Sequence, residues 1–206
     1  MPKLMPFGVT VCGIDELADH RFVGCTHVLS ILDPAAVSPP VFSSYGEHDR
    51  LELRFHDVIE ENMPDHVVPE RRHVEAILRF GRDLVAEPKP AHLLVHCHMG
   101  ISRSSAALAL ILAQARPDWV ASEILSEVVR IRSRAWPNLR MIELGEALLG
   151  RRGEMVAAVS NVYLKQLQRR PELERFFREN GRVREIELAS NLPTTACAAG
   201  GAQMRD

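Results

Sequence analysis

The sequence predicts an α/β fold in which a central, mostly parallel sheet is flanked by helices and followed by a helical C-terminal half. Up to residue 97, short apolar runs alternate with segments of helical periodicity, an order typical of sheets built from strand–helix–strand units. Beyond residue 103 the apolar residues recur only at helical spacing. Together these two observations indicate a sheet in the first half of the chain and helices in the second.

The strands are expected where short apolar runs are bounded by turn residues. They lie at residues 7–13, 27–33, 51–55 and 91–97. The last run, AHLLVHC, is almost continuously apolar, which is typical of a central strand that is buried on both faces.

The helices are expected from the spacing of apolar residues and from their stop signals. Pro69 suits the first turn of the helix that follows it, and the PKP sequence at 88–90 ends that helix. Gly150 ends another. Besides the helix after Pro69, the predicted helices span residues 14–22, 104–115, 121–134, 139–149, 154–168 and 173–180.

The length of 206 residues suits one main domain with additions. We expect a first domain over residues 1–150 and a helical C-terminal extension over residues 151–182. Residues 183–206 are predicted to be a disordered tail, because the final stretch, ELASNLPTTACAAGGAQMRD, offers little apolar surface to bury.

Composition and charge argue against several partners. A formal net charge of −2 gives no reason to expect nucleic acid or an anionic membrane. The longest apolar run, AALALILA, is far shorter than the roughly 18 residues of a membrane span, and the N-terminal sequence has no apolar signal-peptide core. The four cysteines form no short-spaced pair, which fits a reducing compartment. The expected location is the cytoplasm.

The stretch VHCHMGISRS carries the strongest indication of chemistry. A buried strand ends at Cys97 and a helix follows within a few residues, so Gly100 lies in a tight turn whose N–H groups can converge on an anion. Arg103 adds a planar fork of donors that fits two phosphate oxygens. Thiols at helix N-termini or beside cations ionise at pH values of roughly 3.5 to 7.5. We therefore expect Cys97 to be a thiolate nucleophile in a phosphate-binding loop.

Two simpler interpretations of Cys97 explain less of the sequence. An inert buried thiol, which we expect for Cys12, Cys25 and Cys197, would leave Gly100 and Arg103 without a purpose. A metal site built from the neighbouring residues 96–98 fails because successive strand residues point to opposite faces. We therefore expect neither a metal ion nor another cofactor.

The loop resembles the signature of the cysteine-dependent protein tyrosine phosphatases. His-Cys, five residues, Arg and then Ser form that signature, and HCHMGISRS is most similar to the dual-specificity branch. The order of strand, aspartate-bearing loop, helix, strand, signature and helix is also similar over about Phe7 to Leu149. The segment RIRSRAWPNLRMIELGEALL resembles the arginine-rich stretch and closing helix that these enzymes carry after the signature. The resemblance implies a dual-specificity phosphatase-like fold and a phosphatase domain over residues 1–150.

The resemblance assigns roles to the residues of the loop. Cys97 would form a phosphocysteine intermediate, Arg103 would clamp the phosphoryl oxygens, and Ser104 would help the sulfur to leave when water cleaves the intermediate. His96 would lie behind the cysteine. The remaining residues would bind phosphate through backbone N–H groups: His98, Met99, Gly100, Ile101 and Ser102.

The family also requires an aspartate on an upstream loop as general acid. Asp57 follows the strand LELRF almost at once, and a strand end fixes a side chain better than the middle of a loop does. Asp65 has a separation from Cys97 closer to the family's usual one. We predict Asp57, with NMPDHVVP as an inserted stretch and Asp65 as the alternative.

The function predicted from this resemblance is hydrolysis of phosphomonoesters. The expected substrates are phosphorylated proteins with phosphotyrosine, and with phosphoserine or phosphothreonine as the wider set, because the loop has no lysine for a highly charged inositol phosphate. A small-molecule phosphatase and a catalytically weak, phosphate-binding pseudophosphatase are the alternatives. The sequence leaves the oligomeric state open.

Overall fold

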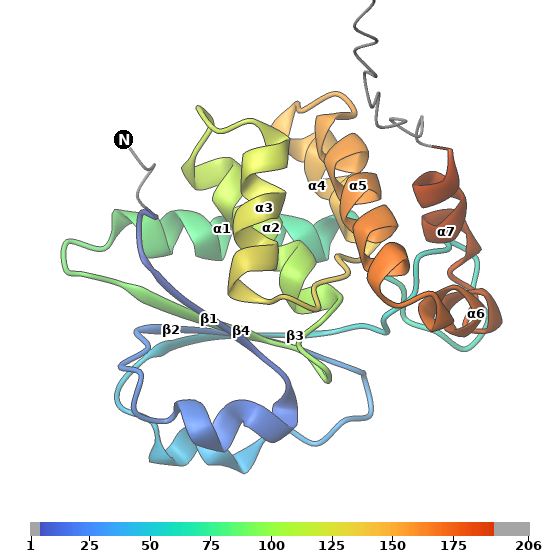
Figure 1. Ribbon diagram of the computed structural model, residues 1–206. Coiled ribbons are helices and arrows are strands. Elements are labelled where there is room, and N and C mark those ends of the chain that lie inside the picture. Colours follow the sequence, from blue (N-terminus) through green and yellow to red (C-terminus); the bar gives the residue numbers. More distant parts are fainter. Residues whose placement is uncertain (1–4, 192–206) are drawn as a thin grey trace, which may run out of the picture.

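A four-stranded parallel sheet forms the centre of the protein, with a thick helical layer on one face and a thin layer on the other (Figure 1). The structure, a computed structural model, describes residues 5–191. The strands are β1 (Gly8–Cys12), β2 (His27–Leu32), β3 (Asp49–Arg54) and β4 (His92–His96). The α-helices are α1 (Arg71–Ala86), α2 (Arg103–Ala115), α3 (Ala121–Ile131), α4 (Leu139–Leu149), α5 (Glu154–Arg169), α6 (Glu172–Glu179) and α7 (Val183–Ser190), and two 3₁₀ helices are η1 (Ile14–His20) and η2 (Pro40–Ser44).

The strand order is β1-β4-β2-β3, and each of these pairings is parallel. The predicted α/β fold with a parallel sheet and a helical C-terminal half is therefore confirmed. Because all four strands run in one direction, the residues that follow their C-terminal ends gather at one edge of the sheet. Asp33, Asp57 and Cys97 all come from chain segments that leave this edge.

The alternation of side chains along the strands creates two cores. Leu93 and Val95 of β4 face the α-helices, whereas Leu94 between them faces the other side of the sheet. On that side the 3₁₀ helices cover a small cluster that includes Leu17 and Phe42. Burial on both faces explains why the three central residues of β4, Leu93 to Val95, are all apolar.

Helix α2 runs through the middle of the larger core. Each residue from Arg103 to Ala113 is buried, and the residues from Ala106 to Ala113 are apolar on every side of the helix rather than on one stripe. Helices α1, α3 and α4 pack around it. Gly145 of α4 lies against Leu110 of α2, so closely that a Cβ atom at that position would be 2.3 Å from a Leu110 side-chain atom. The helix that follows the loop after β4 is thereby fixed in place.

The prediction of a disordered tail is wrong for residues 183–190, which form α7. Ile186 and Ala189 are buried in the main core, and Glu185 is fully buried as well. Four of the eight residues are apolar, but only Ile186 and Ala189 among them are buried, and charged residues lie between them. Packing against α5 and α6 stabilises α7, as tertiary contacts do for most short helices. Residues 192–206 lie outside the described part, and the boundary at residue 150 stays a prediction.

Several other boundaries also differ from the sequence prediction by one to three residues. The helix expected over 121–134 ends at Ile131, because Arg132 has an extended backbone and its side chain turns back to the loop after β4. The helix after Pro69 begins only at Arg71. Within residues 5–191, none of the helices combines the length and the apolar character needed to cross a membrane.

Candidate active site

The turn between β4 and α2 forms a cradle of backbone amide groups. The carbonyl groups of residues 98–102 point outward and accept hydrogen bonds from the surrounding structure. Across a trans peptide the C=O and the next N–H point in opposite directions, so the N–H groups that follow these carbonyls point away from the surrounding structure, into the turn. The backbone N–H groups of residues 98–103 donate no hydrogen bond to any group within residues 5–191. The bonds join Ile14 N to His98 O, Arg132 Nη2 to Met99 O, Arg132 Nε to Gly100 O, Trp136 N to Ile101 O, and Ala106 N and Asn138 N to Ser102 O. Unpaired amide groups at a helix N-terminus are an anion-binding arrangement.

Gly100 allows this turn to pass close to the neighbouring strand. Its φ is +66°, and a Cβ atom there would lie 2.4 Å from the carbonyl carbon of Cys12. Both the left-handed backbone and the close approach exclude a side chain.

We expect Gly100→Ala to destabilise the protein by more than the roughly 1–3 kcal/mol of left-handed strain alone, and to remove phosphate binding. Gly24→Ala is the matched control, since Gly24 has φ +67° but no atom within 4 Å of the added methyl group. Thermal unfolding and vanadate binding measure the two effects. Equal losses of stability in the two variants would contradict the close-packed cradle.

Cys97 lies at the base of the cradle, with only 2% of its surface exposed. Its Sγ is 3.3 Å from Ser104 Oγ, in the first turn of α2. Behind it, His96 Nε2 is 2.7 Å from Ser30 Oγ. Burial lowers the pKa of His96 to about 4, so a neutral imidazole lies under the loop.

Arg103 has one edge of its guanidinium fixed and the other free. Nη1 donates to Asp33 Oδ1 and to the carbonyl oxygen of Phe55, both at 2.6 Å. Its Nε is buried and has no hydrogen-bond partner within residues 5–191. A buried donor without a partner is costly, so this edge of Arg103 is suited to a ligand oxygen. Sequence reasoning missed Asp33, although its place directly after a strand was a usable indication.

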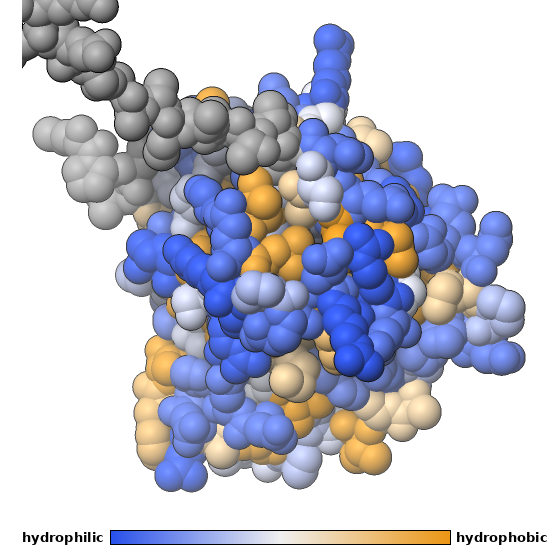
Figure 2. Space-filling view, turned by 45° about the vertical axis from the view of Figure 1, so that its right-hand side comes forward, coloured by the Kyte–Doolittle hydropathy of each residue, from blue (hydrophilic) through white to orange (hydrophobic). Residues whose placement is uncertain are grey.

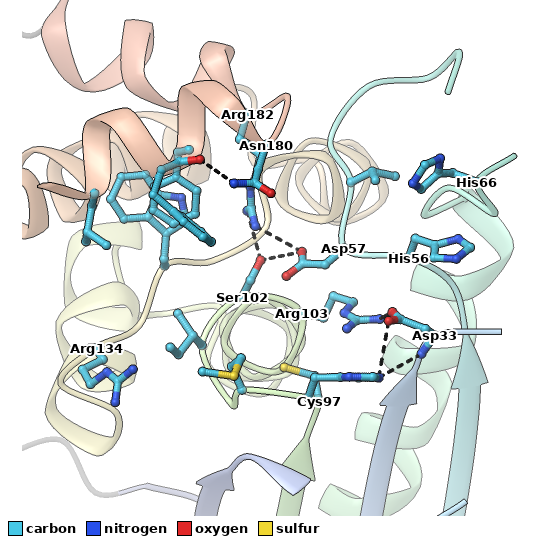
Figure 3. Close-up of a pocket in the computed structure, with 18 of the residues that line it drawn as sticks. Asp33, His56, Asp57, His66, Cys97, Ser102, Arg103, Arg134, Asn180 and Arg182 are labelled. Atoms are coloured by element: carbon cyan, nitrogen blue, oxygen red, sulfur yellow. Dashed lines mark hydrogen bonds and ion pairs between the residues drawn. The ribbon is translucent and has the colours of Figure 1, made fainter. Parts of the chain in front are cut away.

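Asp57 follows β3 and is anchored to the loop after β4 through one of its oxygens. Oδ1 accepts hydrogen bonds from Ser102 Oγ at 2.7 Å and Asn138 Nδ2 at 2.8 Å, and Arg182 Nη1 lies 3.3 Å away (Figure 3). Oδ2 has no such partner in the part of the chain that is described. Asp65, the alternative acid, is exposed, has φ +63° and does not line the pocket.

The predicted loop residues and Asp57 border one pocket of about 570 Å³. Gly100 and Ser104 lie outside its lining, Ser104 in contact with Cys97. Figure 2 brings forward the side that carries α6 and α7, where hydrophobic residues are visible between hydrophilic ones. The pocket lining comprises Asp33, His56, Asp57, Val58, Met63, His66, Cys97, His98, Met99, Ile101, Ser102, Arg103, Arg134, Trp136, Arg170, Leu173, Phe176, Phe177, Asn180 and Arg182.

Several of these residues come from the C-terminal extension, which sequence reasoning gave no part in the site. Leu173, Phe176 and Phe177 of α6 form an apolar wall, and Arg182 follows that helix. Only the contacts of the folded chain bring them to a loop about 75 residues earlier, so no local sequence pattern could have revealed them.

The one group that could hold a metal ion within residues 5–191 lies away from the pocket. It consists of His27, Asp49 and Glu87, whose ligand atoms are all within 4.8 Å of one another. His27 and Asp49 begin their strands, so the group is at the opposite edge of the sheet from Cys97.

Comparison with known structures places the fold among the dual-specificity phosphatases. The PTP-2 phosphatase of Cydia pomonella has a TM-score of 0.53 at 17% identity, covering 68% of this chain and 84% of its own. The human tyrosine phosphatase-like serine/threonine/tyrosine-interacting protein has a TM-score of 0.52 at 17% identity, and the match covers 73% of this chain and 95% of that protein. Human DUSP28 has a TM-score of 0.51 at 16% identity, and the match covers 69% of this chain and 94% of that protein. The sequence matches no family model and no curated protein. These likenesses confirm the fold that the resemblance of the loop predicted.

Proposed function

We propose that the protein is a cysteine-dependent phosphatase that hydrolyses phosphomonoesters through a phosphocysteine intermediate. The observation that carries the proposal is the cradle of amide groups around Cys97, closed by Arg103 Nε; among residues 5–191 neither these amide groups nor this nitrogen has a hydrogen-bond partner. Such a site has donors for the three oxygens of a phosphoryl group and a sulfur nucleophile beneath them.

In the first step the Cys97 thiolate attacks phosphorus, the S–P bond forms and the P–O bond to the leaving group breaks. The leaving oxygen takes a proton from Asp57, whose anchored Oδ1 leaves Oδ2 to carry that proton. Amide groups and Arg103 bind the charge that develops on the phosphoryl oxygens.

In the second step water attacks phosphorus and releases inorganic phosphate and the Cys97 thiolate. Asp57, now ionised, accepts a proton from the water. Ser104 Oγ, 3.3 Å from the sulfur, donates a hydrogen bond to the thiolate as the S–P bond breaks. Since the thiolate and Arg103 supply the nucleophile and the charge stabilisation, the mechanism needs no metal ion.

The walls of the pocket support an aryl leaving group. Leu173 and Phe176 of α6 and Met63 of the loop after β3 line the space beside the cradle, and a ring between apolar walls is stabilised by contact. We propose phosphotyrosine in proteins as the substrate, with phosphoserine and phosphothreonine as the wider set. A small aryl phosphate fits the same walls.

A phosphate-binding protein without turnover is the second candidate, since one of the similar structures is named as phosphatase-like and as an interacting protein. Two observations favour turnover. Asp57 borders the same pocket as Cys97, and Ser104 contacts the sulfur. A binding protein would need neither group.

We expect the protein to hydrolyse p-nitrophenyl phosphate in the presence of excess EDTA. Vanadate should inhibit it, because vanadate adopts the five-coordinate geometry of the phosphorus that Cys97 attacks. Initial rates with and without each reagent test both statements. Hydrolysis that depends on an added divalent ion would contradict the proposal, and binding of phosphate without hydrolysis would establish the second candidate.

A further inference from the structure

Arg182 joins the C-terminal helices to the catalytic loops. It lies between α6 and α7 and is only 5% exposed. Its Nη1 is 3.3 Å from Asp57 Oδ1, and its Nη2 donates to Ser102 Oγ at 3.0 Å. In Figure 3 the guanidinium reaches down from the helical side to both residues. One side chain of the C-terminal extension thus contacts the proton donor and the phosphate cradle together.

A buried carboxylate holds Arg182 in this orientation. Glu185 accepts from Arg182 Nε at 2.8 Å and from Nη2 at 2.7 Å, which leaves Nη1 for Asp57. Glu185 is fully buried and also accepts from Trp136 Nε1 and the amide of Leu139. The two-pronged contact fixes the plane of the guanidinium.

We propose that Arg182 is a positioning residue for the general acid: its charge and its two contacts hold Asp57 and Ser102 in place, so the C-terminal helices are part of the catalytic unit. This inference rests on the proposed function, in which Asp57 is the proton donor. A purely structural arginine would require only the contact with Glu185, whereas Arg182 directs two of its nitrogens to the site.

The charges around Asp57 give the inference a measurable consequence. Burial raises the pKa of Asp57, but Arg182 and Arg103, with hydrogen bonds from Ser102 and Asn138, more than offset it, so the pKa lies below its usual value. Glu185 lies behind Arg182. The other charged or titratable groups that line the pocket are His56 and His66 after β3, Asp33 paired with Arg103, Cys97 and His98 after β4, Arg134 after α3, and Arg170 after α5.

The sign of the effect follows from these charges. The positive charge of Arg182 favours the ionised form of Asp57, so its removal raises the pKa of that carboxyl group. Asp57 then keeps its proton to higher pH. The basic limb of the kcat/KM profile, which reports the acid in the free enzyme, is therefore expected to move to higher pH in Arg182→Gln.

Two variants separate charge from structure. Arg182→Lys keeps the positive charge but loses the two-pronged contact, so its basic limb should stay close to that of the wild type while kcat falls. Glu185→Gln removes the negative charge behind Arg182, so the limb should move to lower pH. Loss of stability cannot by itself move the basic limb to higher pH in Arg182→Gln and to lower pH in Glu185→Gln. Thermal unfolding identifies any variant that fails to fold.

The experiment measures pH profiles for hydrolysis of phenyl phosphate by the wild type and the three variants, with Asp57→Asn as background. In the Asp57→Asn background the basic limb due to the general acid is absent, so we expect Arg182→Gln to cause no further change in the pH profile. The carboxyl ¹³C shift of Asp57, titrated by NMR, gives the same pKa order without any turnover. Unchanged Asp57 titration in Arg182→Gln and Glu185→Gln would overturn the inference. Absence of Cys97-dependent hydrolysis in the wild type would overturn the proposed function instead.

Discussion

Cys97→Ser is expected to lower the turnover of p-nitrophenyl phosphate by at least about 10⁴-fold, because a serine hydroxyl stays protonated where the thiol ionises and the nucleophile is lost. The side chain is almost fully buried and of similar size, so the fold should persist. The cradle of amide groups is unchanged, and the variant should still bind a phosphotyrosine peptide. Steady-state rates and isothermal titration measure the two effects.

Cys25→Ser is the matched control for that variant. Cys25 is also buried, at 7% exposure, but it belongs to the small core on the other face of the sheet. The Cys25→Ser variant should therefore hydrolyse p-nitrophenyl phosphate at the wild-type rate. A turnover rate of Cys97→Ser within tenfold of the wild type would show that Cys97 is not the nucleophile.

Arg103 provides the second arm of the same test. In Arg103→Lys an ammonium can replace the bond to Asp33 but cannot also present a second, parallel donor edge to the phosphoryl group. We expect a loss of about 10²- to 10³-fold in kcat, comparable with the removal of one oxyanion donor. A lysine variant with wild-type kcat would contradict the role of the unpaired Nε.

Asp57→Asn is expected to lower kcat by about 10²- to 10⁴-fold, the usual contribution of a general acid. The loss should be large with phenyl phosphate, whose leaving group needs a proton, and small with a leaving group acidic enough to depart as an anion. The basic limb of the pH–rate profile should disappear as well. Rates with a series of aryl phosphates test all three statements.

Asp65→Asn separates the two candidate acids. Asp65 is exposed and lies outside the lining of the pocket, so this variant should keep both the basic limb and the wild-type dependence on the leaving group. If Asp65→Asn loses them and Asp57→Asn does not, Asp65 is the acid and NMPDHVVP is not an insertion. If neither variant shows the effect, slow turnover without proton donation describes the protein better.

The fold was predictable because its main determinants are local in sequence. The apolar run of β4, the glycine after it and the apolar run of α2 from Ala106 to Ala113 each depend on their own local environment, and the parallel order follows from the alternation of elements. The place of Asp57 was predictable for the same reason, since it follows a strand. Residues after parallel strands reach the same edge of the sheet.

The remainder of the site depends on contacts between distant segments, which a single sequence does not reveal. Arg182 and Glu185 are charged residues in a polar stretch and would normally be read as solvent-exposed. They are buried because they form an ion pair with each other, and because Asp57 and Ser102 bind Arg182 while the Trp136 ring nitrogen donates to Glu185. The same pairing helps to hold α7 in place, since only Ile186 and Ala189 among its apolar residues are buried.

The most direct test of the account is to identify the atom that receives the phosphoryl group. Ser104→Ala should slow hydrolysis of the intermediate, because the sulfur loses its hydroxyl partner. Rapid acid quenching of this variant with p-nitrophenyl phosphate, followed by peptide mapping by mass spectrometry, should find phosphate on Cys97, and none when Cys97→Ser is added. Phosphate on another residue, or turnover without any phosphoenzyme while nitrophenol is released in a single step, would contradict the phosphocysteine mechanism.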